Sequence, residues 1–387
     1  MNALRLTVLC SVLLMPLTSA AATPAPPAPG PHDEALRALG RDWLSHYHGI
    51  GLSIGIYDDG KSSFFNFGST QLEGNRPPTK DTIYEIGSIS KTMTVQILAR
   101  ATIEGRVRLA DEVERYLGAP YPNLAKDGEK VRLIHLANMT SQLADNIPDL
   151  TQVRQFGAEP VAIAKMRVQA AYTREEFLRQ LHGLAPRGTP GGDPAHSYVG
   201  SMVLGVALET VYGEPFAQIL EHEIEKPMKM HSGTAPDPKL LAKGYTRFNE
   251  VLPTFDAELN YPASSLRYSA DDLLRFATWQ LVERDASVKL AHQPTWQTND
   301  GHQSIALQWV LLESSHGRRL HCSGGTYGFA ATVDLYPDAG IAVVLLSNRA
   351  ADDAQDSLRA LSAKILDSLR PEVSPPPAPA GAPPAAR

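Results

Sequence analysis

The sequence predicts a protein of the α/β (α+β) class, with one antiparallel sheet, a helix at each end of the chain and a mostly helical subdomain in between. Two strand-like stretches lie near each end of the chain, and each pair is bordered on its outer side by a helical stretch. The intervening residues, about 110–230, carry helical patterns and loops. Because the two strand pairs can join in one sheet, we expect the terminal helices on one face and the helical subdomain on the other.

Apolar periodicity and turn residues place the individual elements. In the first helix, large apolar side chains recur on one face, as expected for a helix packed on a sheet: Leu36, Leu39, Trp43 and Tyr47. The predicted helices are 34–47, 88–104, 271–282 and 352–369, the predicted strands are 52–57, 63–67, 321–335 and 340–347, and the helix-and-loop segments of the subdomain are 111–117, 131–139, 174–184 and 200–228.

The residues that precede the first helix indicate export. Arg5 is followed by an apolar run at 6–17 and then by small residues, which is the pattern of a secretory signal peptide over residues 1–22. The run is too short to anchor the chain in a bilayer, so no membrane span is expected. A Pro-rich linker, 23–33, follows. We therefore expect a periplasmic or secreted protein.

The composition is that of a globular chain with one large core. The 387 residues, 43% of them hydrophobic, are enough for a single domain over 34–370. A net charge of −6, without a cluster of lysines and arginines, argues against a nucleic-acid partner. Cys10 would be removed with the signal peptide, which leaves Cys322 without a partner for an internal disulfide. The Pro/Ala-rich tail, 371–387, is expected to be disordered.

The helix that begins at Ser88 brings a serine and a lysine onto one face. Ser88 and Lys91 form the one Ser-x-x-Lys pattern of the chain, and residues three apart are neighbours on a helix. Gln96, Arg100 and Glu104 form a polar stripe, and Lys91 falls roughly 140° away from it, toward the core. Burial favours the neutral amine, which can accept the serine proton and make Ser88 a nucleophile. The structural alternative is a helix-capping serine beside a lysine stem that covers apolar surface.

Further blocks extend this pattern along the chain. They occur in the order Ile86-Gly-Ser-Ile-Ser-Lys91, Glu104-Gly105, Leu109-Ala-Asp-Glu-Val113, Pro227-Met-Lys-Met230, Tyr261-Pro-Ala-Ser-Ser-Leu266, Ser269-Ala-Asp-Asp-Leu273, Trp309, Gly324-Gly-Thr-Tyr-Gly-Phe329 and Val343-Val-Leu-Leu-Ser-Asn348. In content and order they resemble the serine hydrolases related to class C β-lactamases and DD-peptidases (penicillin-binding proteins). The likeness spans about 34–370.

This resemblance implies a β-lactamase/transpeptidase-like fold and an acyl-enzyme on Ser88. It also implies an oxyanion hole made by the backbone N–H groups of Ser88 and Gly325, where the missing glycine side chain permits close approach. The family's third motif would then contact substrate through Cys322, Ser323 and Gly324. The implied substrates are β-lactams, D-Ala peptides or small esters.

The second motif of the family, Tyr-Ser/Ala-Asn, is replaced. At its spacing after Pro190-Gly191 the chain has His196-Ser197-Tyr198. An imidazole titrates near 6.5, whereas a phenol titrates near 10, so His196 is chemically suited to be a general base. Alternatively, His196 is a loop histidine that fills the space of a lost catalytic group. Tyr198 would contact substrate through its ring or its hydroxyl.

The third motif, Lys/His-Thr/Ser-Gly, is also replaced, by Cys322-Ser323-Gly324 with His321 one position early. A neutral thiol cannot neutralise a substrate carboxylate. Neighbours on a strand point to opposite faces, so if Cys322 faces the cleft, His321 faces away. Losing a charge-assisted contact costs about 1.5–3 kcal/mol. We therefore expect weak β-lactamase and carboxypeptidase activity and more tolerance for uncharged esters or amides.

Three functions are compatible with these residues. The first is an exported serine hydrolase in which Ser88 attacks a carbonyl while Lys91 and His196 manage protons. The second is a catalytically impaired protein that binds cell-wall fragments, which the altered motifs favour and the intact first motif opposes. The third is an esterase for small acyl esters. In each case the partner is a small-molecule or peptidoglycan-derived substrate. We expect a monomer that needs no cofactor. We also expect no metal site, because the histidines lack metal-ligand spacing.

Overall fold

The computed structural model describes residues 30–47, 49–153, 160–298, 301, 303–314 and 316–371. The predicted signal peptide, residues 23–29 of the predicted linker and residues 372–387 of the predicted tail lie outside the described residues. Among the described helices, none has both the length and the apolar character that crossing a membrane requires.

Within the described residues, eight strands form one antiparallel sheet in the order β2-β1-β14-β13-β12-β11-β10-β9. The strands are β1 (Gly51–Asp58), β2 (Lys61–Gly68), β9 (Trp296–Gln297), β10 (Ser304–Ile305), β11 (Val310–Ser314), β12 (Gly317–Gly325), β13 (Ala330–Tyr336) and β14 (Ile341–Ser347). The N-terminal hairpin joins the C-terminal one through β1 and β14, with Leu52 opposite Ser347. The predicted fold class is therefore confirmed: the two ends of the chain share one sheet.

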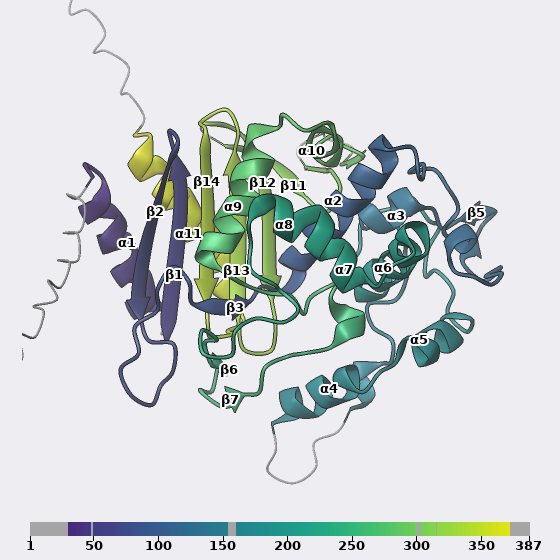
Figure 1. Cartoon of the computed structure of the whole chain (residues 1–387), viewed down its shortest axis with the longest axis horizontal. Helices are drawn as coiled ribbons and strands as arrows, with labels where there is room; N and C mark the ends of the chain where they lie inside the picture. The colour runs from purple at the N-terminus through teal and green to yellow at the C-terminus, as the bar shows by residue number, and fades with distance from the viewer. Residues whose placement is uncertain are drawn as a thin grey trace, which may run out of the picture.

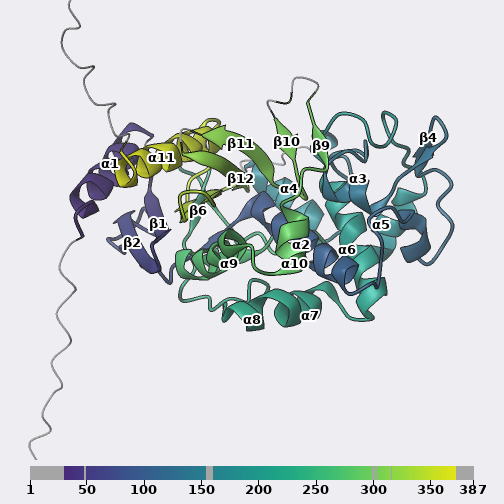
Figure 2. The ribbon, with the colours of Figure 1, turned by 90° about the horizontal axis from the view of Figure 1, so that it is seen from above.

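Helices cover both faces of this sheet (Figure 1). α1 (Asp33–His46) and α11 (Ala354–Leu369) pack together on one face, whereas α9 (Ala270–Val282) packs on the other, as Figure 2 shows from above. The indole Nε1 of Trp43 on α1 donates a hydrogen bond to Ser357 Oγ on α11 at 3.1 Å. The apolar layer under these two terminal helices includes Leu52, Ile54 and Val343, which alternate with residues that face α9.

The second core surrounds α2 (Ser90–Ile103), which runs from the sheet into the helical subdomain. The subdomain and its neighbours contain α3 (Leu133–Ala137), α4 (Val161–Ala170), α5 (Arg174–Leu181), α6 (Tyr198–Tyr212), α7 (Phe216–Leu220), α8 (Lys226–Met228) and α10 (Ala286–Ala291). Short two-stranded ladders complete the fold: β3 (Ile83–Glu85) with β8 (Arg267–Ser269), β4 (Ala125–Lys126) with β5 (Glu129–Lys130), and β6 (Gly244–Tyr245) with β7 (Val251–Leu252). α2 thus links the two parts of the molecule.

Two predicted features differ in the structure. The stretch 321–335 is not one strand, because β12 ends at Gly325 and a turn closed by a hydrogen bond from Thr326 N to Phe329 O leads into β13. The helix predicted over 88–104 begins as a 3₁₀ turn, Gly87–Ile89, and becomes α-helical at Ser90. Both differences place a tight turn where the sequence pattern predicted regular structure.

The polar stripe on α2 does not all face solvent. The side chain of Gln96 is buried, and its Nε2 donates to Ser287 Oγ on α10 at 2.7 Å. Gln280 Nε2 on α9 donates to Gln96 Oε1 at 3.0 Å. Because both ends of the amide have partners, α10 and α9 can cover this face of α2. The expectation that Gln96 marks an outer face is therefore wrong, although Lys91 does face the core.

Candidate active site

Ser88 lies where the backbone turn before α2 meets the end of β12. Gly87 has a left-handed φ of 54°, and a Cβ there would lie 2.4 Å from Gly325 N. A Cβ on Gly324 would lie 2.0 Å from Ile86 O and 2.9 Å from Ser88 N. Only glycines permit this approach. The contact brings the turn that carries Ser88 N–H against the strand end that carries Gly325 N–H, the two predicted oxyanion donors.

Lys91 is buried one turn after the partly exposed Ser88. Its Nζ lies 2.7 Å from Ser88 Oγ. Burial lowers the pKa of Lys91 to about 8, against smaller opposing effects of Cys322 and Asp145. The amine is also 4.4 Å from the centre of the Tyr198 ring, whose face attracts the ammonium form and opposes the lowering. A substantial neutral fraction is therefore present at mildly alkaline pH, directly against the serine hydroxyl.

His196 approaches Lys91 from the loop before α6. Its Nε2 lies 3.4 Å from Lys91 Nζ, and its Nδ1 lies 2.6 Å from Asp145 Oδ1. Burial raises the pKa of Asp145, but the hydrogen bond and charge of His196, together with Lys91, outweigh it and hold that pKa below its ordinary value. The carboxylate accepts from Nδ1–H, and in the neutral imidazole this arrangement places the Nε2 lone pair on the side of Lys91.

Tyr198 lies against the same group of side chains. Its ring packs edge-to-face on His196, with centroids 4.7 Å apart. Burial and Asp145 raise the pKa of Tyr198, while a side-chain hydrogen bond with Ser88 lowers it by less. A phenol whose pKa is raised stays protonated, so Tyr198 is suited to donate a hydrogen bond and poorly suited to accept a proton.

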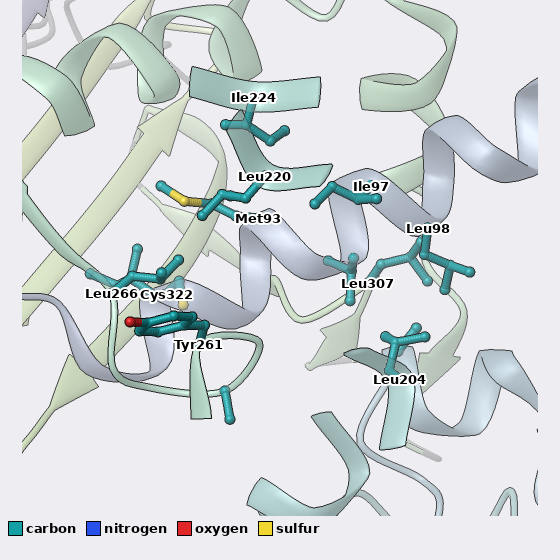
Figure 3. Close-up of a cluster of buried hydrophobic side chains, with 14 of the residues drawn as sticks. Met93, Ile97, Leu98, Leu204, Leu220, Ile224, Tyr261, Leu266, Leu307 and Cys322 are labelled. Atoms are coloured by element: carbon teal, nitrogen blue, oxygen red, sulfur yellow. The ribbon is translucent and has the colours of Figure 1, made fainter. Parts of the chain in front are cut away.

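The three positions of the altered third motif separate on β12. Cys322 is buried among apolar side chains such as Met93 and Leu266, as Figure 3 shows, and burial raises the pKa of its thiol to about 12. His321 points to the other face, where its Nδ1 lies 2.8 Å from Asp334 Oδ1. Strand alternation puts the Ser323 side chain on that face too, and Gly324 on the face of Cys322. The position of the family's cation is thus occupied by a neutral thiol beside Lys91.

A cleft of about 730 Å³ opens beside these residues. Of the site residues predicted from the sequence, Tyr198 and Gly325 line it, together with Asp145, Thr326 and Tyr327. Two cations, Lys165 on α4 and Arg187 after α5, also line the cleft. The cleft is large enough for a small peptide or a bicyclic lactam.

Residues 33–366 match the family described as Beta-lactamase. The chain belongs to the β-lactamase family.

Curated relatives of this β-lactamase-family chain include a "Beta-lactamase" of Pseudomonas fluorescens, 23% identical over 77% of this chain and 88% of that protein. Another is the "D-alanyl-D-alanine-carboxypeptidase/endopeptidase AmpH" of Escherichia coli K12, 24% identical over 77% and 79%.

Solved structures show the same fold. A class C beta-lactamase superposes with a TM-score of 0.74 at 19% identity, covering 87% of this chain and 96% of that one. A "Beta-Lactamase/D-Alanine Carboxypeptidase from Pseudomonas syringae" superposes with a TM-score of 0.71 at 19% identity, covering 87% and 99%.

Sequence reasoning missed Asp145, Thr326 and Tyr327 as residues of this β-lactamase-family site. Asp145 lies 51 residues before His196, and no spacing rule connects them. Thr326 and Tyr327 belong to the block Gly324-Gly-Thr-Tyr-Gly-Phe329, but only the turn between β12 and β13 shows that they form a wall of the cleft.

Proposed function

We propose that this chain is a serine hydrolase that forms an acyl-enzyme on Ser88, with an amide or ester as the acyl donor. The observation that supports this most is the 2.7 Å contact between Ser88 Oγ and the buried amine of Lys91, whose pKa is lowered to about 8. A neutral amine at this distance can take the hydroxyl proton as the oxygen attacks. A helix-capping serine beside a snorkelling lysine would leave the ammonium in water, and Lys91 is buried.

The proposed acylation begins at Ser88. Ser88 Oγ bonds to the substrate carbonyl carbon, and its proton passes to Lys91 Nζ. The N–H groups of Ser88 and Gly325 stabilise the oxyanion, helped by the positive end of the helix that starts there. When the carbonyl re-forms, the bond to the leaving amine or alcohol breaks, and that group takes a proton from the Lys91–His196 pair. A water molecule hydrolyses the ester by the same steps in reverse order.

The names of the relatives support β-lactams and D-Ala peptides as substrate classes. The neutral thiol at Cys322 supports a shift toward acyl donors without a carboxylate near the scissile bond, and thus weak β-lactamase activity. We also propose that residues 1–22 direct export to the periplasm or medium and are removed. Protein from the periplasmic fraction whose intact mass corresponds to a chain that begins after residue 22 would support this proposal of export and cleavage.

Intact-mass spectrometry of the mature protein tests the enzyme. Samples are incubated with a penicillin, a D-Ala-D-Ala peptide and a p-nitrophenyl ester, and the same panel is run on Ser88→Ala. We expect a covalent adduct or turnover with the ester first, and neither with Ser88→Ala. If no acyl donor gives an adduct or product, the chain is instead a binding protein for cell-wall fragments, and retained fragment binding measured by calorimetry would support that second function.

A further inference from the structure

A carboxylate outside the predicted machinery, that of Asp145, contacts His196, which in turn faces the nucleophile's base. The carboxylate of Asp145 and the imidazole of His196 continue the line that starts at Ser88 Oγ and Lys91 Nζ, with successive contacts of 2.7, 3.4 and 2.6 Å. The second and third contacts join α2, the loop before α6 and the loop that carries Asp145, so the line crosses three separate segments.

We propose that Asp145 is a positioning residue, which holds His196 in the tautomer whose Nε2 lone pair faces Lys91, and so gives the proton of Ser88 a second acceptor. The inference rests on the proposed hydrolase function and adds a residue to it. In this arrangement Ser88, Lys91, His196 and Asp145 act in series.

Backbone hydrogen bonds fix the distance between Asp145 and His196. The N–H groups of Tyr198 and Val199 donate to the carbonyl of Asp145 at 2.9 and 3.3 Å, and Ser197 Oγ donates to Ala144 O at 2.7 Å. These hydrogen bonds join the two loops directly next to the side-chain contact. His196 and Asp145 are half-exposed, so burial alone would not hold the imidazole, and the carboxylate must do so.

Without Asp145 the imidazole could carry its proton on either nitrogen. The tautomer with the proton on Nε2 would direct an N–H at the Lys91 amine and offer it no lone pair. With Asp145, the Lys91 ammonium formed during acylation can pass its proton to Nε2, and the imidazolium so formed is stabilised by the carboxylate. The proton is then available to the leaving group, and Lys91 returns to the neutral form.

Other titratable groups lie around the line from Ser88 to Asp145. Cys322 of β12 and Tyr198 of α6 flank Lys91, and Tyr327 interacts with Tyr198. The thiol and both phenols have raised pKa values and stay neutral through pH 9. Asp145 is thus the negative charge that acts on Lys91 and His196 among these described groups.

A direct charge effect of Asp145 on Lys91 is the competing explanation, and a double-mutant cycle separates the two. Pre-steady-state acylation by a p-nitrophenyl ester is followed from pH 6 to 10 in wild type, Asp145→Asn, His196→Phe and the double variant. We expect Asp145→Asn to slow acylation on the order of 10- to 100-fold with little change in KM, and Asp145→Glu to recover part of the rate. In the His196→Phe background, Asp145→Asn should change the rate less than about threefold. The matched control is Asp193→Asn, which removes an exposed carboxylate three residues before His196 that does not line the cleft.

An equal effect of Asp145→Asn in both backgrounds, or none in either, overturns the proposal. Nitrogen NMR of ¹⁵N-histidine-labelled protein, with the His196 signal assigned by its loss in His196→Phe, gives an arm independent of activity. We expect the Nδ1–H tautomer in wild type and a mixture in Asp145→Asn, and an unchanged tautomer would equally overturn the proposal. If wild type forms no Ser88 adduct, the hydrolase function fails, while this arm still decides where the His196 proton lies.

Discussion

The buried amine of Lys91 carries a cost in stability at neutral pH. Its pKa falls from an ordinary 10.5 to about 8, chiefly by burial. One pKa unit corresponds to about 1.36 kcal/mol, so the ammonium form is less stable in the folded chain by on the order of 3 kcal/mol. The folded state binds this proton less readily than the unfolded state. The cost is therefore complete below about pH 8 and disappears as pH rises toward 10.5.

We expect Lys91→Met to raise the free energy of unfolding at pH 7 by about 1–3 kcal/mol while abolishing acylation. The substitution keeps the aliphatic length and removes the charge, and it forfeits the contact with Ser88 and the Tyr198 ring. Urea denaturation at pH 7 and pH 10 measures the free energy of unfolding, and the advantage of Lys91→Met over wild type should be smaller at pH 10. Lys61→Met, on an exposed strand residue, should change stability by less than about 0.5 kcal/mol. A loss of stability at pH 7 would mean that Lys91 is held by contacts stronger than its desolvation.

For single residues, the sequence was informative where helical periodicity determines which side chains share a face. Ser88 and Lys91 share a helix face by spacing alone, and burial of Lys91 followed from its angle to the polar stripe. Asp145 could not be found in this way, because its contact with His196 depends on two loops tied by backbone hydrogen bonds. Gln96 was placed on the wrong side because only the packing of α10 supplies the partner that lets an amide be buried.

Among the contacts between elements, the one between the Gly87–Ile89 turn and β12 leaves no room for added side chains. The two backbones touch without side chains between them, so the distance between the Ser88 and Gly325 N–H groups depends on glycine at two positions, Gly87 and Gly324. Oxyanion donors act only when their geometry is held to a fraction of an ångström, so the proposed hydrolysis depends on this contact.

Gly87→Ala tests this contact, with Gly340→Ala as its matched control. Both glycines have left-handed φ, 54° and 70°, so both substitutions carry similar backbone strain of about 1 kcal/mol. A Cβ on Gly340 meets nothing within 4 Å, whereas one on Gly87 would lie 2.4 Å from Gly325 N. We expect Gly340→Ala to keep its acylation rate and Gly87→Ala to lose at least about 100-fold, both measured by ester burst kinetics. Equal rates would show that β12 can shift without harm.

The elements that the sequence predicted well are those with a long repeating pattern, such as α1, β1 and α11. The prediction of a single strand over 321–335 was wrong because the turn that connects β12 and β13 is only four residues long. β9 and β10 have two residues each, which is too short for a pattern of their own. They form because β10 pairs with β11 and β9 pairs with β10. Such short strands form because they pair with neighbouring strands in the folded chain, and local sequence patterns do not show this pairing.

For the molecule as a whole, Glu85 connects three distant stretches behind the active site. It ends β3, its Oε1 accepts from Phe255 N at 2.7 Å, and its Oε2 accepts from Thr326 Oγ1 at 2.6 Å. Phe255 and Thr326 both line the cleft. The carboxyl group is fully buried, and burial raises its pKa to about 7 against the smaller lowering effects of these hydrogen bonds. The cleft wall is therefore held by an acid that titrates near neutrality.

The sign of the pH effect follows from linkage. The folded state binds the Glu85 proton more tightly than the unfolded state, whose pKa is near 4.5. The stabilisation of the protonated form is complete below about pH 4.5 and is lost as pH rises through about 7, a change on the order of 3 kcal/mol.

Glu85→Gln should remove this dependence and make the chain about 1–3 kcal/mol more stable than wild type at pH 8, with little difference at pH 5. The amide oxygen can still accept from Phe255 N, and the amide N–H can donate to Thr326 Oγ1, so the three stretches stay connected. Guanidinium denaturation at pH 5 and pH 8 measures the change, and Glu73→Gln, an exposed loop glutamate, should leave the pH dependence as it is in wild type. If Glu85→Gln were the less stable protein at pH 8, the ionised carboxylate would be the form that holds Phe255 and Thr326 together, and the cleft would gain its rigidity from a buried charge.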